Sequence, residues 1–225
     1  MNLNAESEGP ERRITNLPRL DPDIALVRQF RATGNPQVFE IIFRKYQTPV
    51  FHLVHRMVHG EEAYDLTQEI FVKALRSIFT FKGDCKFSTW LYTIARNMCL
   101  NHLRDTRTRT DREQYSLNDS PYRDGDSDRD IPDPSADVER ITEVRELQRI
   151  VDSLLAELPD EQRLLITLRD LQHLSYEEIS DITGLSLVNV KSKLHRARLA
   201  FKSKFAPYLS AVGSEALSQS ELVRK

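Results

Sequence analysis

Aromatic and cationic side chains alternate between residues 79 and 97, in the segment FTFKGDCKFSTWLYTIARN. The aromatic residues are Phe79, Phe81, Phe87, Trp90 and Tyr92, and the cations among them are Lys82, Lys86 and Arg96. An aromatic ring can stack on an unpaired base and contribute about 1 to 3 kcal/mol, while a neighbouring cation holds the nucleic-acid backbone. The same segment also contains an apolar stripe at helical spacing, formed by Trp90, Leu91, Ile94, Ala95 and Met98. Two interpretations, capture of a single strand and ordinary core packing, therefore stay open for this segment by itself.

A second candidate surface for nucleic acid lies after Ser186, a residue type that favours the start of a helix. One face of this expected helix is apolar and carries Val190, Leu194, Ala197, Phe201 and Phe205. The other positions carry cations with no acidic residue between them, namely Lys191, Lys193, Arg196, Arg198, Lys202 and Lys204. Exposed helices usually mix both signs of charge, and the whole chain has 32 Lys and Arg against 34 Asp and Glu. A one-sided cationic face in such a chain favours a polyanionic partner.

The cationic helix follows a shorter helix and a tight turn. Ser175 and Glu178 have the spacing of a capping box, Ile179 and Ile182 supply an apolar side, and Gly184 ends the helix. This order is typical of a helix-turn-helix unit, whose second helix enters the DNA major groove. Residues near the start of that helix reach base edges, and the candidates are Asn189, Lys191, Ser192, His195 and Arg196. Lys193 and Arg198 are better placed for phosphates.

Metal and catalytic sites find little support in the residues. Asp124, Asp126 and Asp128 imitate the start of a calcium loop, but the sixth and twelfth positions hold Arg129 and Ser135 instead of Gly and a carboxylate. Cys99 and His102 have ligand spacing without a certain third and fourth ligand, so burial of Cys99 is favoured. The chain has no Gly-rich phosphate loop and no nucleophile paired with a base. We therefore expect no catalytic residue, no metal site and no cofactor.

The elements that must position these residues are helices, because apolar residues recur at three- and four-residue intervals and only seven glycines occur in the chain. We expect helices at 21–32, 36–59, 61–79 and 88–104, then a helix up to residue 158 and another from 159 to about 171. Residues 105–137 are rich in Asp, Arg, Ser and Pro and nearly free of apolar side chains. The fold class is all-α, with two small helical domains (21–104 and 138–208) joined by a flexible acidic linker (105–137).

The chain has 225 residues and 40% hydrophobic content, enough for two small domains without disulfides. Residues 1–20 contain Glu and Pro but no apolar core segment, so we expect a disordered arm and neither a signal peptide nor membrane insertion. Residues 209–225 form a tail of unknown role. Two cysteines, Cys85 and Cys99, at wide spacing suit a reducing, cytoplasmic location.

Three segments resemble the extracytoplasmic-function (ECF) sigma factors, the small two-domain group 4 of the sigma-70 family. DLTQEIFVKAL, from Asp65 to Leu75, is similar to the polymerase-binding segment of that family. FKGDCKFSTWLYTIARNMCLNHLRD is similar to its promoter-melting and minus-10 segment, and LPDEQRLLITLRDLQHLSYEEISDITGLSLVNVKSKLHRAR to its minus-35 domain. The domains would then correspond to sigma regions 2 and 4. One departure is Ser180, at a tight helix-turn-helix position where Ala is common.

The resemblance implies roles for particular residues. Those implied for docking on core RNA polymerase, at the β′ clamp helices, are Asp65, Gln68, Glu69 and Val72. Those implied for the minus-10 element are Phe81, Lys82, Asp84, Lys86 and Phe87 in a loop that captures a flipped base, and Ser88, Trp90, Arg96 and Asn97 on the helix beside the melted bubble. Unpairing a base costs a few kcal/mol, and a pocket that fits the preferred base offsets that cost.

The expected function is therefore that of a promoter-specificity subunit, with promoter DNA and core RNA polymerase (β′ clamp helices and β flap) as partners. The resemblance also implies an anti-sigma factor as a partner and a monomeric state. A stand-alone helix-turn-helix regulator would explain the C-terminal domain alone, but such proteins normally dimerise and no separate dimer helix is evident. Transcription by core polymerase plus this chain distinguishes the two.

Overall fold

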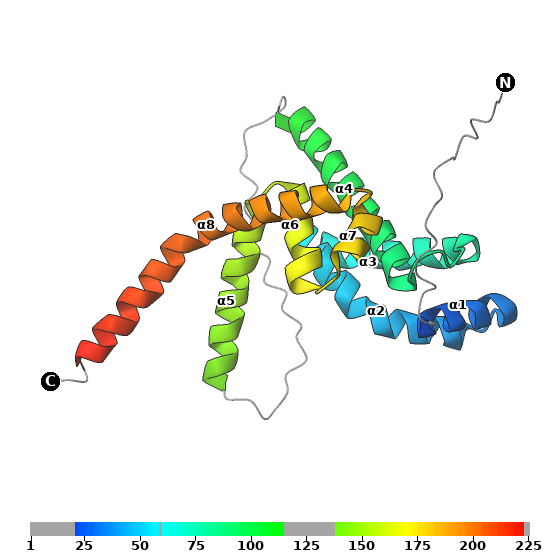
Figure 1. Ribbon diagram of the computed structural model, residues 1–225, viewed down its shortest axis with the longest axis horizontal. Coiled ribbons are helices and arrows are strands. Elements are labelled where there is room, and N and C mark those ends of the chain that lie inside the picture. The colour runs from blue at the N-terminus through cyan, green and yellow to red at the C-terminus, as the bar shows by residue number, and fades with distance from the viewer. Residues whose placement is uncertain (1–20, 59, 115–137, 223–225) are drawn as a thin grey trace, which may run out of the picture.

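The computed structural model describes residues 21–58, 60–114 and 138–222, and the side chains of 21–58, 60–109 and 145–208. Every regular element within these ranges is helical, so the expected all-α class is confirmed there (Figure 1). The predicted N-terminal arm (1–20) and most of the predicted linker (115–137) lie outside the described residues.

The N-terminal block consists of α1 (Pro22–Thr33), α2 (Pro36–Met57), α3 (Glu62–Ser77), the short 3₁₀ helix η1 (Ile78–Thr80) and α4 (Phe87–Gln114). Side chains of Asp21 and Asn35 cap the first two helices by accepting hydrogen bonds from backbone amides two residues later, at 3.1 and 3.0 Å. Gly34 ends α1 with φ +63, a left-handed conformation that glycine adopts without strain. These local signals explain why α1 and α2 lie close to their predicted bounds.

The last helix of this block differs from the prediction. It was expected to end at Arg104, but α4 continues to Gln114, into the segment assigned to the linker. Within this extension the Thr108 hydroxyl donates to the Arg104 carbonyl at 2.9 Å, and Arg107 forms an ion pair with Asp160 at 2.9 Å. An ion pair to a distant helix cannot be seen in the local composition on which the linker boundary was based.

The C-terminal block consists of α5 (Val138–Ala156), α6 (Asp160–Ile166), the π-helical turn η2 (Thr167–Leu171), α7 (Tyr176–Thr183) and α8 (Leu187–Leu222). The predicted capping box is present, because Ser175 Oγ accepts from the Glu178 amide at 3.1 Å and Glu178 Oε2 accepts from the Ser175 amide at 2.8 Å. Gly184 ends α7 with φ +72 as expected. The final helix α8 runs past Tyr208 into the segment assigned to the tail.

The two blocks pack against each other. Their buried apolar side chains form one continuous core, in which α4 lies against α7 and α2 against α6 (Figure 1). The sequence pattern predicted two helical domains joined by a linker and gave no sign of this contact.

Buried arginines connect the blocks at the C-terminal end of α2. The Arg163 side chain is 6% exposed, and its Nη1 donates to the Met57 carbonyl at 3.1 Å while Nη2 donates to Asp160 Oδ1 at 2.6 Å. Nearby, Arg56 Nε lies 3.2 Å from Asp152 Oδ1. Burial lowers the pKa of Arg163, and Asp160 counteracts that effect. Because the last carbonyls of a helix have no partner within it, a guanidinium from the other block satisfies groups that would otherwise be desolvated.

Candidate nucleic-acid interface

The aromatic residues before and at the start of α4 form a buried cluster. Phe81 and Phe87 are 4% and 1% exposed, and their ring centroids lie 5.8 Å apart at an interplanar angle of 85°. The half-buried Trp90 ring lies 5.2 Å from Phe81 and 5.4 Å from Phe87. Phe81 and Phe87 therefore belong to the hydrophobic core, and they flank the loop that joins them.

The polar residues of that loop form an exposed rim above the cluster. Lys82, Asp84 and Lys86 are exposed, and Gly83 has φ +83, which lets the chain turn tightly between them. Farther along α4, Ser88 is half-buried, and the half-buried Arg96 donates to Asn97 Oδ1 at 3.0 Å from its Nη1. The structure thus places Lys82, Asp84 and Lys86 on an exposed loop flanked by the aromatic cluster, while Arg96 and Asn97 lie farther along α4 and contact each other.

Part of this surface faces α7 of the other block. Lys86 Nζ lies 2.8 Å from Glu178 Oε1, and the Tyr92 hydroxyl donates to Gln172 Oε1 at 3.0 Å. The hydrogen bond to Glu178 raises the pKa of Lys86. Burial tends to raise the pKa of Glu178, but hydrogen bonds from Lys86 and Ser175 lower it below its ordinary value. Burial raises the pKa of Tyr92 to about 12.

The cationic helix α8 has the expected buried side, since Val190, Leu194 and Ala197 are nearly inaccessible. Its cations, however, are not uniform. Three of them pair with acidic residues at the ends of other helices: Lys193 with Glu161 at 2.6 Å, Lys204 with Glu157 at 2.5 Å, and Arg198 with Asp170. The expectation of a wholly unbalanced cationic face is therefore wrong at these three positions, because the acids come from elements distant in the sequence.

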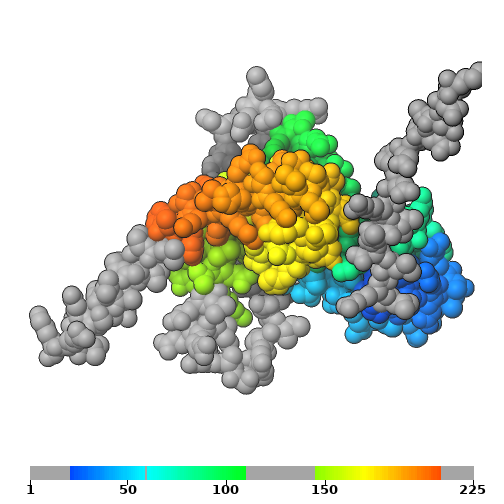
Figure 2. All heavy atoms as spheres, viewed as in Figure 1, coloured from blue at the N-terminus to red at the C-terminus, as the bar shows by residue number. Residues whose placement is uncertain are grey.

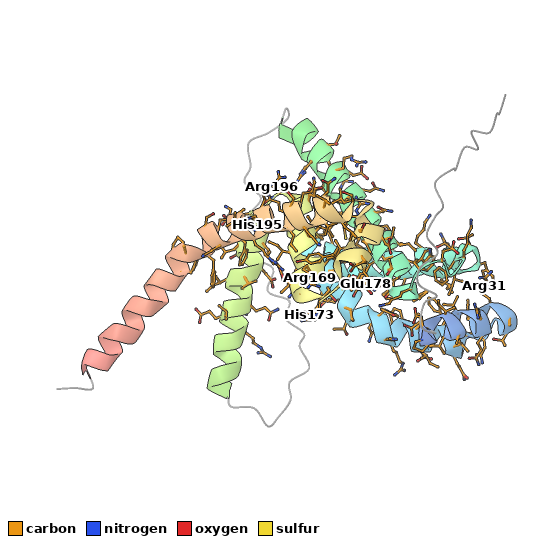
Figure 3. All side chains as sticks on the ribbon, in the orientation of Figure 1. Arg31, Arg169, His173, Glu178, His195 and Arg196 are labelled. Atoms are coloured by element: carbon orange, nitrogen blue, oxygen red, sulfur yellow. The ribbon has the colours of Figure 1, made fainter. Side chains whose placement is uncertain are left out.

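The outer face of α8 carries the five residues predicted to reach bases, which are Asn189, Lys191, Ser192, His195 and Arg196, and all five are exposed. Arg196 Nη2 donates to Ser192 Oγ at 3.0 Å, and Lys191 Nζ lies 5.7 Å from the Tyr176 ring centroid. No acidic partner contacts either cation within the part of the chain that the structure describes. The part of α8 whose side chains are described lies on the face of the molecule that Figure 2 shows. Figure 3 shows His195 and Arg196 on this helix.

The sequence analysis did not single out Val188, which is 75% exposed beside Asn189 on the face of α8 that carries the predicted base contacts. Val188 falls outside the apolar stripe of Val190, Leu194 and Ala197, and this position is the signal in the sequence that could have identified it. In a major groove such a side chain suits the methyl group of thymine.

The turn before α8 is held by Ser180. Its Oγ donates to the Leu185 carbonyl at 2.6 Å, across the turn that contains Gly184. Alanine at this position would lack that bond, so the departure at Ser180 fastens α7 to the turn that leads into α8.

The residues predicted to contact polymerase lie on one exposed face of α3. Asp65, Gln68 and Glu69 are exposed, and Val72 is 46% exposed. Leu75 and Phe79, which the sequence analysis did not single out as polymerase contacts, extend this face and are 38% and 55% exposed. Leu75 follows Val72 by three residues and Phe79 follows Leu75 by four, and this helical spacing is the signal that could have found them.

The cysteines have the environment of structural thiols. Cys99 is buried, as expected, and burial raises its pKa to about 12. Burial and the nearby Asp181 and Asp84 raise the pKa of the half-buried Cys85. His102 lies 2.9 Å from Glu62 through its Nε2. No group of three metal-ligating side chains gathers within the described residues, and none of the helices in the described ranges has the length and hydropathy needed to cross a bilayer.

Comparison with known proteins assigns both blocks of the chain to one family. Residues 42–109 match the sigma-70 region 2 model, and residues 148–201 match the sigma-70 region 4 model. The RNA polymerase sigma-H factor of Pseudomonas aeruginosa is 35% identical over 178 residues, covering 78% of this chain and 90% of the relative. The ECF RNA polymerase sigma-E factor of Haemophilus influenzae is 35% identical over 188 residues, covering 83% and 97%.

Solved structures support the same fold. CnrH, in complex with the cytosolic domain of CnrY, aligns with a TM-score of 0.59 at 21% identity, covering 83% of this chain and 99% of CnrH. The sigma factor RpoE of Bartonella quintana, in complex with the anti-sigma factor NepR, aligns with a TM-score of 0.57 at 20% identity, covering 75% and 96%.

A region 2 helical unit followed by a region 4 helix-turn-helix defines the class of sigma-70 factors. Within that class, the chain belongs to the ECF sigma factors, because its relatives match over most of both lengths.

Proposed function

We propose that this protein binds core RNA polymerase and directs it to a specific set of promoters, without a catalytic site of its own. The observation that carries this proposal is the outer face of α8, whose exposed Asn189, Lys191, Ser192, His195 and Arg196 follow a helix-turn-helix turn in a chain of ECF type. We place this activity in the cytoplasm, where bacterial transcription takes place.

The minus-35 element is recognised as duplex by α8. Polar groups for base edges come from five exposed residues near the start of this helix, which are Asn189, Lys191, Ser192, His195 and Arg196. Lys193 and Arg198 lie at the flanks of this face and form ion pairs with Glu161 and Asp170. Each must leave its acidic partner before it can contact a DNA phosphate. In this division the outer face selects the sequence and the flanks adjust affinity.

The minus-10 element is captured as a single strand by the loop between Phe81 and Phe87 and by the start of α4. Lys82 and Lys86 hold the backbone, while Asp84, Ser88, Arg96 and Asn97 offer polar groups to an unstacked base. Phe81, Phe87 and Trp90 support that rim and offer aromatic surface where the loop opens. Melting then needs no nucleotide hydrolysis, since binding of the flipped base offsets the cost of unpairing.

Polymerase docks on α3. Asp65, Gln68, Glu69 and Val72 provide an acidic and apolar face for the basic clamp helices of the β′ subunit, and region 4 reaches the β flap. On this proposal region 2 occupies residues 21–104 with the continuation of α4, and region 4 occupies residues 138–208.

An anti-sigma factor is the further partner that the family suggests. The Bartonella RpoE was solved with the anti-sigma factor NepR, and CnrH was solved with the cytosolic domain of CnrY. We propose that this chain, a monomer when free, is held inactive in a similar complex, which co-purification from its native host tests.

Reconstituted transcription tests the main proposal. Purified chain and core polymerase alone should start RNA synthesis from a cognate promoter found by transcript mapping, whereas a stand-alone regulator would not support initiation without another sigma factor.

Asp65→Lys should abolish this activity by placing a cation against a basic surface, while binding of the free chain to minus-35 duplex stays unchanged. Equal loss of polymerase and duplex binding in this variant would contradict the assignment of α3 to polymerase.

A further inference from the structure

The loop proposed to capture the minus-10 base is attached at both ends to α1, a helix outside the matched region 2 segment. That segment begins at residue 42, after α1 has ended at Thr33. At the first end of the loop, Arg31 Nη1 donates to the Phe81 carbonyl at 2.9 Å. At the other end, Asp21 Oδ2 accepts from the Phe87 amide at 3.0 Å. Figure 3 shows Arg31 at the end of α1 that faces the end of α3.

Each of these side chains is charged, and each bonds to backbone and not to another side chain. The bonds therefore fix the course of the loop whatever residues occupy it, and hydrogen bonds to charged groups are stronger than neutral ones. Asp21 and Arg31 sit about 15 Å apart along the helix, at 1.5 Å per residue. The rigid helix thus sets the distance between the two attachment points.

The helix itself is fastened to the rest of region 2. Asp23 is 3% exposed and binds Lys45 Nζ of α2 at 2.6 Å, and it accepts a hydrogen bond from the Tyr46 hydroxyl. Phe30 packs between Phe39 and Phe79, with ring centroids 5.5 and 6.2 Å away. These contacts hold α1 in place independently of the loop, so that α1 can serve as a support for it.

We infer that Asp21 and Arg31 are positioning residues for minus-10 recognition, an inference that rests on the function proposed above. They hold the rim formed by Lys82, Asp84 and Lys86 in one geometry before DNA arrives. A loop already ordered loses less conformational entropy when it binds, and the gain is greatest for the base that fits its fixed shape. Releasing either end should therefore weaken discrimination between bases more than it weakens overall binding.

The variants Asp21→Asn and Arg31→Ala test this inference. Asparagine is as good a helix N-cap as aspartate, so Asp21→Asn can keep the cap on the Asp23 amide through its carbonyl oxygen. Its amide NH₂ cannot accept a bond from the Phe87 amide, so one loop end is released. Arg28→Ala is the matched control, because it removes an exposed cation of α1 that makes no hydrogen bond to the loop.

The measurement uses the full chain assembled with core polymerase. The probe is a fluorescent single-stranded oligonucleotide of the minus-10 non-template sequence, taken from transcripts started by the wild-type holoenzyme, with each base tried at each position. We expect the ratio of affinities for preferred and other bases to fall about tenfold, or about 1.4 kcal/mol, in Asp21→Asn and in Arg31→Ala. Core-polymerase affinity and the thermal unfolding midpoint should equal those of Arg28→Ala.

An unchanged ratio in both variants would overturn the inference. So would an equal loss for all bases accompanied by a lower unfolding midpoint, since that is the result of a merely structural role. If the wild-type holoenzyme itself prefers no unpaired base, the proposed function fails instead, and the two failures are distinguished by that single measurement.

Discussion

The minus-10 and minus-35 surfaces of this protein are built in opposite ways. On α8 the residues proposed to read duplex stand exposed on a helix face, and the buried side of the helix is a separate set of residues. Around α4 the same residues serve both stability and the proposed capture of DNA. Phe81 and Phe87 belong to the core, and Lys86 is paired with Glu178 of the other block.

The difference follows from the target. A duplex groove accepts a helix as it stands, so a rigid, exposed face is sufficient for recognition. A single base must be unstacked and then enclosed, which requires a pocket with a floor, a rim and ordered ends. The floor can only be made of side chains that also stabilise the domain. We therefore expect mutations in the two surfaces to have different costs.

The largest effect should come from Phe87→Ala. The ring is 1% exposed and packs against Phe81, Trp90 and Tyr46, so its removal leaves a cavity in the core. We expect a loss of about 3 to 5 kcal/mol in the free energy of unfolding, measured by urea titration. Phe79→Ala, at a ring that is 55% exposed, is the control and should cost much less. Similar losses in the two variants would show that Phe87 is not part of the core.

A smaller effect, on binding and not on stability, should distinguish the two classes of cation on α8. Arg196→Ala should weaken binding to minus-35 duplex by about 1 to 3 kcal/mol and relax base preference, because its guanidinium faces outward without an acidic partner among the described residues. Lys193→Ala should weaken binding less, since Lys193 must first give up Glu161. Fluorescence anisotropy of labelled duplex at several salt concentrations measures both, and the slope with salt shows how many phosphates are lost. A greater loss in Lys193→Ala would reverse the assignment of flank and reading face.

The features that sequence could predict are those set by neighbours in the chain. The capping box of Ser175 and Glu178 and the helix end at Gly184 need only a few consecutive residues, and they lie where they were expected. The exposed residues of α8 could also be predicted from the sequence. A helical period of 3.6 residues separates the two faces of this helix once Val190 and Leu194 are placed in the core.

The features that sequence could not predict depend on how the two blocks dock. Arg163 and Met57 are distant in the chain, and neither residue type signals that a guanidinium will satisfy the end of α2. The sequence also left the burial of Phe81 and Phe87 undecided. Sequence spacing does not distinguish an aromatic ring that packs in the core from one that is exposed for stacking on a base. The acids that pair with α8 went unnoticed for the same reason, as Glu157, Glu161 and Asp170 lie on other elements.

The smallest effect concerns the ion pair of Lys86 and Glu178, which joins the minus-10 surface to α7 of the other block. Glu178→Gln removes the charge but keeps the capping box, because glutamine serves at that position as well as glutamate. The Lys86 side chain is 57% exposed, so the pair should contribute less than about 1 kcal/mol to the free energy of unfolding. Glu177→Gln, at an exposed neighbour, is the matched control.

The effect of Glu178→Gln should depend on pH in one direction. Since the pKa of Glu178 is lowered in the folded protein, its contribution is present above the unfolded value of about 4.3 and is lost as the pH falls through the folded pKa. Wild type should therefore exceed Glu178→Gln in stability at pH 7, and the difference should vanish in more acidic solution. Trp90, the only tryptophan in the chain, reports unfolding from within the same turn of α4, because its amide donates to the Lys86 carbonyl at 3.2 Å. A difference that does not shrink as the pH falls below the unfolded value, or that Glu177→Gln reproduces, would mean that this ion pair does not hold α7 against the minus-10 surface.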